Sequence, residues 1–323
     1  MVLALKTGNV PKGKAGKMRK AIVLSMLASA AVAAEAWTVP NWSTIVTEPD
    51  CIEQYIGKTR CGHCQGMCVS SNAIYFSFFN QIVKTDWYGR LLKRIEVDIH
   101  NGDICYWNGR LYTGVWLKPP KGSDEKWCAQ ICMYDADTLE LLKSAKMDWD
   151  GGADGITCLD GVVYLALGGR GTYDPEKKCG RMECYRKFDA ETLEPIGDVI
   201  KIDHGYNSLC GSQNMTTDGT YIYSSHYTED EAAGTPNLIV HDKDFNVVAM
   251  YRLGRNNGLD FVPGGRDGAV RFAWVFTPNW MNWGKKWVGP EPRVSAIVQF
   301  AEIKDGKVTD LTYHAGFRRH IQR

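Results

Sequence analysis

The chain has 323 residues, of which 38 are lysine or arginine and 37 are aspartate or glutamate. Because these charges nearly balance, the composition does not favour electrostatic binding to nucleic acid or to an anionic membrane. The 33 glycines and 11 tryptophans are typical of an all-β protein with many tight turns, and the chain is too long for a disulfide-stabilised miniprotein.

The N-terminal segment has the pattern of an export signal. Lys17-Met-Arg-Lys20 precedes the apolar stretch AIVLSMLASAAVAAEA, whose small residues suit cleavage after Ala33 or Ala36. The stretch is too short for a stable membrane anchor, and no second long apolar run follows it. We therefore expect residues 1–36 to be an N-terminal extension and signal peptide that is removed. Residues 37–323 are expected to form a single secreted or periplasmic domain with no membrane span.

The first motif after the signal is CGHCQGMC, from Cys61 to Cys68. Its spacing fits a redox CxxC pair, a zinc site that includes His63, or cysteines paired in disulfides. A reactive CGHC needs a following helix whose N-terminus lowers the thiol pKa, whereas the residues here are expected to form a strand. Export favours oxidised sulfur, so we expect structural disulfides, with metal binding and redox chemistry as the alternatives.

The other cysteines lead to the same expectation. Either Cys128 or Cys132 is expected to bridge to Cys179 or Cys184, which flank the equivalent strand of the next repeat. Cys68 and Cys105, at equivalent positions of two innermost strands, are expected to line the core. The full connectivity does not follow from the sequence.

A strand–turn–strand unit with an aspartate in its turn recurs along the chain. Its copies are IVKTDWYGRLLKRIEVD, ICMYDADTLELLKSAKMD, YRKFDAETLEPIGDVIKID and LIVHDKDFNVVAMYRLG, with a weaker fifth copy, IVQFAEIKDGKVTDLTYH. The turn aspartates Asp86, Asp135, Asp189 and Asp242 lie about fifty residues apart. Internal repetition at this period is typical of propellers and solenoids.

A second unit alternates with the first and completes the pattern. GDICYWNGRLYTG, DGITCLDGVVYLA, NMTTDGTYIYSS and the related GMCVSSNAIYFS each read as a hairpin, because Asn-Gly and Asp-Gly tolerate positive φ. Four strands per repeat, repeated five times, predict an all-β fold: a five-bladed β-propeller with four antiparallel strands per blade. A two-sheet sandwich is the alternative. The segment TVPNWSTIV is expected to add a closing strand to the last blade.

These repeats resemble those of secreted bacterial five-bladed β-propeller proteins. The resemblance is architectural and covers most of residues 37–323. No motif identifies one enzyme family, and a fold alone does not establish a function.

Loop lengths indicate where a functional site is expected. The turns of one face are short, whereas WLKPPKGSDEKW, GGRGTYDPEKKC, HYTEDEAAGTPN and TPNWMNWGKKWVGPEP gather on the other. Long loops on a rigid scaffold commonly carry function. We therefore place the expected site at the central mouth of this loop-rich face.

Polar and aromatic residues of the loop-rich face form the predicted site. Many of them also suit the hydrogen bonds of tight entry turns. The residues expected to bind a ligand are His63, Gln65, Asn101, His204, Gln213, Asn214, Asn257, His226, Tyr227, Trp280 and Trp283.

Three aspartates and one histidine are the candidates for chemistry. HNGD, GADG and NGLD look alike and bring Asp103, Asp154 and Asp260 toward the axis. Carboxylate and amide oxygens suit Ca²⁺ or another divalent cation, so these aspartates are the predicted metal ligands. Together with His100 they are also the predicted catalytic residues, since acid–base chemistry needs such groups.

Three functions fit this pattern. The first is binding, with hydrolysis as an extension, of a carbohydrate-type ligand, because tryptophans stack on sugar rings and paired carboxylates cleave glycosides. The second is a non-catalytic, lectin-like or protein-docking propeller with a structural ion. The third is a metal-dependent lactonase or esterase. We expect a monomer that binds a small molecule or glycan.

Overall fold

The computed structural model describes residues 44–46, 64–97, 100–119, 121–168, 180–228, 236–251, 258–262, 270–276, 297–305 and 307–310. The chain divides into two compact units, Met1–Ala36 and Trp37–Arg323, and all described residues belong to the second. None of the described segments forms a helix that is long and apolar enough to cross a membrane. Signal cleavage and export stay predictions.

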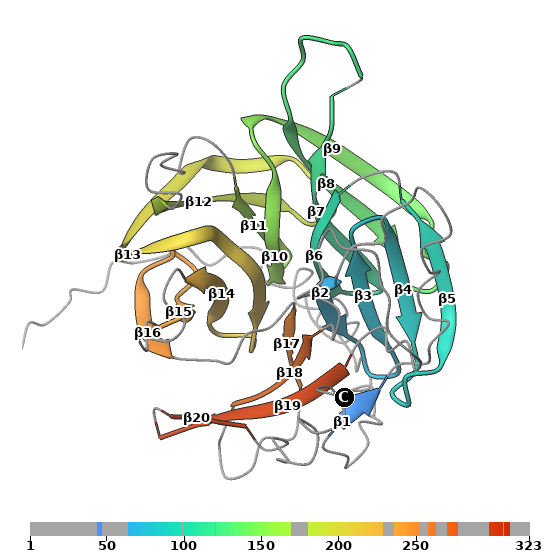
Figure 1. Ribbon diagram of the computed structural model, residues 1–323, viewed down its shortest axis with the longest axis vertical. Helices are drawn as coiled ribbons and strands as arrows, with labels where there is room; N and C mark the ends of the chain where they lie inside the picture. The colour runs from blue at the N-terminus through green and yellow to red at the C-terminus, as the bar shows by residue number, and fades with distance from the viewer. Residues whose placement is uncertain are drawn as a thin grey trace, which may run out of the picture. The chain divides into compact units, whose positions relative to one another are not determined.

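The described elements are β-strands arranged as five blades of four antiparallel strands (Figure 1). Blade one contains β2 (Cys64–Val69), β3 (Ile74–Phe78), β4 (Gln81–Thr85) and β5 (Leu91–Glu96). Blade two contains β6 (His100–Trp107), β7 (Arg110–Leu117), β8 (Cys128–Asp135) and β9 (Leu141–Asp150). Blade three contains β10 (Ala153–Leu159), β11 (Val162–Leu167), β12 (Gly180–Asp189) and the first part of β13 (Pro195–Thr217).

The remaining strands complete the ring. Blade four contains the second part of β13 with β14 (Ile222–Thr228), β15 (Leu238–His241) and β16 (Val247–Tyr251). Blade five contains β17 (Leu259–Phe261), β18 (Val270–Phe276) and β19 (Ile297–Lys304). Its outer edge is shared by β1 (Thr44–Val46) and β20 (Lys307–Asp310), which both pair with β19. The five-bladed β-propeller is confirmed, and so is the closing strand from the N-terminal segment.

The described residues form five hydrophobic core clusters, one between each pair of neighbouring blades. Between blades five and one, for example, Met67 and Phe76 share a cluster with Val275 and Phe300. This arrangement follows from the pleat, because alternate side chains of a strand point to opposite faces of its sheet. Both faces of each blade are therefore buried, apart from the outermost strand. Burial of the inner strands fixes the positions of the residues at the axis.

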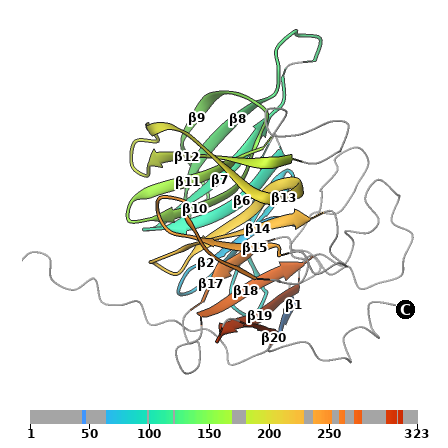
Figure 2. The same ribbon diagram turned by 90° about the vertical axis from the view of Figure 1, so that its left-hand side faces the viewer.

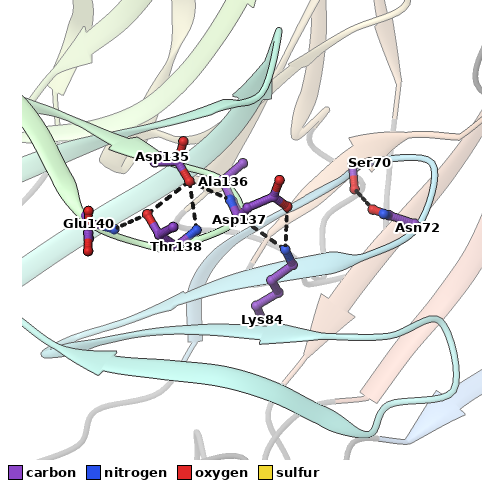
Figure 3. Close-up of polar contacts among 8 residues, drawn as sticks. All are labelled: Ser70, Asn72, Lys84, Asp135, Ala136, Asp137, Thr138 and Glu140. Carbon is purple, nitrogen blue, oxygen red and sulfur yellow. Dashed lines mark hydrogen bonds and ion pairs between the residues drawn. The ribbon is translucent and has the colours of Figure 1, made fainter.

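Turns on the short-turn face match the sequence signals. Asn108 and Asp160 have φ of 48° and 52°, and the glycine after each has φ of 76°, the conformation that a two-residue hairpin turn requires. In the aspartate turns the carboxylate accepts backbone hydrogen bonds: Asp135 Oδ1 lies 2.7 Å from the amide nitrogen of Thr138 (Figure 3). The four turn aspartates all make such contacts.

The aspartate turns also join neighbouring blades. Lys84 of blade one donates to the carbonyl of Ala136, at 3.1 Å, and to the carboxylate of Asp137, at 3.0 Å, in the turn of blade two (Figure 3). Lys187 makes the equivalent contact with the carbonyl of Lys243 in the turn of blade four. The repeat therefore encodes both a turn and a contact to the adjacent blade.

The cysteine predictions were partly wrong. Cys128, Cys132 and Cys184 carry free thiols, so the predicted bridge from Cys128 or Cys132 does not form. The bridge was inferred from export and from the equivalent strand positions of these cysteines in neighbouring repeats, and the structure does not pair them. Cys68 and Cys105 do line the core as predicted, and each is buried.

The motif CGHC enters a strand, as predicted. Cys64 opens β2 as a buried cysteine whose Sγ donates a hydrogen bond to the carbonyl oxygen of Gly66 at 3.2 Å. No helix follows, so the feature that activates a redox CxxC is missing from this described strand. Cys61 and His63 lie outside the described residues.

Candidate functional site

The innermost strands β2, β6, β10, β13 and β17 surround the propeller axis (Figure 1). In four blades the pairing of the inner strand shifts register near its start: at Cys64/Gly66, Asn101/Ile104, Ala153/Ile156 and Ser212/Asn214. Such bulges bend a strand and redirect its side chains, and they are frequent beside functional sites. The bulges lie toward the loop-rich face.

Glycines allow the inner strands to approach closely at this level. A Cβ on Gly66 would lie 2.2 Å from Asp103 Oδ1, and a Cβ on Gly102 would lie 2.7 Å from the carbonyl oxygen of Ala153. One on Gly258 would lie 2.5 Å from the backbone nitrogen of Met67. The last contact joins blade five to blade one, so the ring of inner strands is closed.

Asp103 lies fully buried at the axis and connects several blades. Its Oδ2 accepts hydrogen bonds from the backbone amides of Ile156, at 3.2 Å, and Met215, at 2.7 Å, which belong to blades three and four. Burial raises the pKa of this carboxyl well above its usual value, although these amides oppose the shift. Asp103 thus satisfies backbone groups that two other inner strands leave free.

Asp260 makes comparable contacts from blade five. Its Oδ2 accepts from the amide of Val69 at 2.7 Å, and its Oδ1 accepts from the Thr216 hydroxyl and from its own neighbour, the amide of Phe261. Enclosure of the carboxyl raises its pKa to about 6. Met215 and Thr216 are consecutive, so a single stretch of β13 contacts both axial carboxyl groups.

A row of aromatic rings lies at the loop-rich ends of blades one and two. The imidazole of His100 stacks on Phe79, with centroids 4.3 Å apart, and lies 6.0 Å from Trp116. Trp127 packs edge-on against Trp116 at 6.3 Å and is 39% exposed. These four residues, Phe79, His100, Trp116 and Trp127, are called the aromatic row below.

His100 is a neutral imidazole in this environment. Burial lowers its pKa to about 4, and the side-chain amide of Gln65 donates to its Nε2 at 2.8 Å. The proton of the ring therefore lies on Nδ1. At neutral pH His100 therefore has no proton to donate from Nε2, and its predicted catalytic role stays a prediction.

Asp154 lies directly beside the aromatic row. Its Oδ1 accepts from the indole Nε1 of Trp116 at 2.9 Å, and Gln213 donates to the same carboxyl. Burial raises its pKa to about 7, these two donors oppose the rise, and the negative charge of Glu183 adds to it. At neutral pH the Asp154 side chain therefore populates both its protonated and its carboxylate form.

Behind Asp154 lies a buried hydrogen-bonded relay that sequence reasoning missed. The Nε2 of His226 lies 2.9 Å from the Ser224 hydroxyl, which in turn lies 2.6 Å from the Ser212 hydroxyl. The Nδ1 of His226 lies 3.4 Å from Glu183 Oε1, and Glu183 Oε2 accepts from the amide of Ser212 at 3.0 Å. A glutamate within the largely apolar strand segment MECY was the available signal.

The predicted site residues are thus placed in three settings. Asp103, Asp260, Asn101 and Asn214 are at the axis, Asn101 and Asn214 each being 1% exposed. Gln65, His100, Asp154 and Gln213 form the mouth beside the aromatic row, and His226 is enclosed in the relay. His63, Asn257, Trp280 and Trp283, and the side chains of His204 and Tyr227, lie outside the described residues.

The predicted metal site has a different geometry from the ring that was expected. In the part of the chain that the structure describes, Asp103, Asp154 and Asp260 share no hydrogen-bond partner. Asp154 faces Trp116, while the other two face inner-strand amides. Among the described residues no group of three or more His, Cys, Asp or Glu side chains is close enough to hold a metal ion. Metal binding by these three aspartates stays a prediction.

No protein-family model matches the chain, and no curated protein is similar to it. Among solved structures, it is similar to BamB from Moraxella catarrhalis, with a TM-score of 0.37 and 12% identity over 77% of this chain and 62% of that chain. It is also similar to a protein of unknown function from Bacteroides caccae, with a TM-score of 0.39 and 13% identity over 69% of this chain and 96% of the other.

A third similar structure is the quinohemoprotein alcohol dehydrogenase from Comamonas testosteroni. Its TM-score is 0.36 and its identity 13%, over 67% of this chain and 45% of that chain. The chain spans less than two thirds of BamB and of this dehydrogenase. Similarity this weak does not indicate a function for this chain.

Proposed function

We propose that the loop-rich mouth of this propeller binds a carbohydrate-type ligand. The observation that carries the proposal is the aromatic row, which lies beside the carboxyl of Asp154 and the amides of Gln65 and Gln213. Aromatic rings next to a few polar groups are the chemistry of a small-molecule site.

The chemistry of the mouth suits a sugar ring. The CH face of a pyranose packs on an exposed indole, and Trp127 is the exposed indole of the row. Sugar hydroxyls both donate and accept, as do the amides of Gln65 and Gln213. Asp154, shared between its two protonation states near neutral pH, can serve a hydroxyl either as acceptor or as donor.

The test is glycan-array binding followed by titration of the best ligand, monitored through tryptophan fluorescence. Trp127→Ala is expected to weaken binding by about 5- to 30-fold, because stacking on one ring contributes about 1–2 kcal/mol. Tyr88→Ala is the matched control, since Tyr88 is also an exposed aromatic but lies in a turn of the opposite face. Equal affinity of wild type and Trp127→Ala would refute the proposal.

Hydrolysis of the bound glycan is a second candidate, favoured by the state of Asp154. A carboxyl with a pKa of about 7 is suited to act as a general acid at neutral pH, and Glu183 is a second carboxyl close enough to influence it. The test is a screen of aryl glycosides with Asp154→Asn. Loss of turnover with retained binding supports hydrolysis, whereas binding without turnover by wild type leaves a lectin-like propeller.

Export of the protein is proposed on the sequence alone. The basic and apolar pattern of residues 17–36 supports it. Intact mass spectrometry of the protein from the periplasm or medium is expected to give an N-terminus after Ala33 or Ala36. A cytoplasmic protein that keeps these residues would contradict export.

A further inference from the structure

The propeller axis contains buried polar atoms that have no hydrogen-bond partner among the described residues. Oδ1 of Asp103, Oδ1 of Asn214 and both amide atoms of Asn101 are unpartnered, although these residues are 0% to 1% exposed. The amide of Asn214 lies beside the Asp103 carboxyl, but no hydrogen bond of good geometry reaches Oδ1. Buried polar atoms almost always have partners, so such a group in a folded protein needs an explanation.

These atoms converge on one place from several blades. Oδ1 of Asp103 is the atom nearest to a Cβ on Gly66 of blade one. Asn214 of blade four donates through Nδ2 to the carbonyl oxygen of Gln65, the residue before Gly66, at 2.6 Å. Asn101 precedes Asp103 by two positions on β6. The Asp103 carboxyl and the Asn214 side-chain amide therefore lie next to each other, against Gln65 and Gly66 of blade one.

The axis also contains two buried carboxyl groups without a matching cation among the described residues. The carboxyl groups of Asp103 and Asp260 both lie close enough to the Cys68 and Cys105 thiols to act on them electrostatically. Neither carboxyl has a lysine or arginine among its contacts in the described residues. Buried charges are normally paired or coordinate a metal.

We propose that the axis binds one divalent, oxygen-ligated cation, with Ca²⁺ as the matching ion, through Asp103 Oδ1 and the amide oxygen of Asn214. Ca²⁺ accepts carboxylate, amide and backbone carbonyl oxygens in flexible geometry. Its two charges match the two axial carboxyl groups. Asn101, two positions before Asp103 on the same strand, carries a further buried amide oxygen for which the described residues provide no partner.

This axial site differs from the ring predicted from the sequence because Asp154 does not belong to it and two asparagines do. It is also separate from the proposed ligand site, since Asp154 and the aromatic row make none of these contacts. An ion at this position would connect inner strands of blades two and four and so contribute to stability rather than to ligand binding.

The test measures Ca²⁺ in the full chain by elemental analysis and compares thermal unfolding with Ca²⁺ and with a chelator. Wild type is expected to hold one equivalent and to unfold about 5 °C or more higher when Ca²⁺ is present at a hundred times its Kd. Asp103→Asn is expected to lose the ion, whereas Asp154→Asn, which removes an equally buried carboxyl, keeps it. If Asp103→Asn does not fold, calorimetric titration of Asn214→Ala with Ca²⁺ provides the second variant, with at least tenfold weaker binding expected.

Three outcomes would overturn the proposal. The first is wild type without a stoichiometric ion and without a response to Ca²⁺. The second is an Asp103→Asn or Asn214→Ala variant that binds Ca²⁺ as wild type does. The third is an infrared band of a protonated carboxyl that disappears in Asp103→Asn, since a neutral Asp103 would donate to Asn214 in place of an ion.

Discussion

Asp154→Asn gives a test of the site through the pH dependence of stability. The carboxyl has a pKa of about 7 in the folded protein, against an ordinary value of 3.8, mainly because it is buried. A difference of about three units corresponds to about 4 kcal/mol between the two protonation states. Asparagine has the same shape, stays neutral, and can still accept from the indole of Trp116.

The sign follows from proton binding. The folded protein keeps the Asp154 proton up to about pH 7, whereas the unfolded chain releases it near pH 4. The contribution of Asp154 to the free energy of unfolding is therefore complete below about pH 4 and is lost as pH rises toward 7. Asp154→Asn removes this loss, so relative to wild type it gains up to about 4 kcal/mol between pH 4 and pH 8.

The assay is denaturant unfolding monitored by circular dichroism at pH 4, 5, 6, 7 and 8 for both proteins. The quantity of interest is the difference between them at each pH, because other titrating groups then cancel. We expect this difference to move in favour of the variant with increasing pH and to level off above pH 7. A difference that stays constant over this range would refute the buried, protonated state of Asp154.

Two further predictions concern stability. Gly66→Ala brings a Cβ within 2.2 Å of the Asp103 carboxylate and 2.6 Å of the Asp103 Cα, and is expected to cost about 3 kcal/mol or more. Gly219→Ala, at φ of 89° in open space, is expected to lower the free energy of unfolding by only about 1 kcal/mol. Chemical denaturation compares the two variants. Equal losses of stability would contradict the close approach of Gly66 to Asp103. Asp135→Ala removes a carboxylate that accepts hydrogen bonds from two turn amides. It is expected to lower the free energy of unfolding by about 1 kcal/mol, whereas the exposed substitution Asp137→Ala is expected to lower it by less than about 0.5 kcal/mol. The reverse order in a thermal scan would contradict the role of the turn.

The fold could be predicted because each repeat is specified by sequence signals that involve only neighbouring residues. Asn108 with Gly109, and Asp160 with Gly161, set the hairpin turns through positive φ, and Asp135 closes its turn with its own side chain. Each of these signals depends on a few neighbouring residues. Repetition at a near-constant interval then requires the same supersecondary unit each time, and this leads to a propeller.

The candidate site could be predicted only in outline, because its geometry depends on contacts between blades. Glu183 lies in a strand rather than in an entry loop, and its partner His226 is 43 positions away, so the relay has no local signature. The predicted bridge from Cys128 or Cys132 failed for a similar reason. Export makes oxidised cysteines common, but whether Cys132 meets Cys184 is determined by strand positions that the sequence does not encode locally.

The three aspartates show how a small difference in register separates residues that look alike in sequence. The bulges of β6 and β10 match, since Asn101 and Ile104 pair with Val115 and Thr113 as Ala153 and Ile156 pair with Leu167 and Leu165. Asp154 is therefore equivalent to Gly102, and Asp103 is equivalent to Gly155. Because the side-chain period of a strand is two, a displacement of one residue sends the two carboxyl groups in different directions. Asp103 consequently reaches the inner-strand amides at the axis, whereas Asp154 reaches the indole of Trp116 at the mouth. The order of glycine and aspartate in HNGD and GADG thus separates an axial carboxyl from one that faces the ligand site.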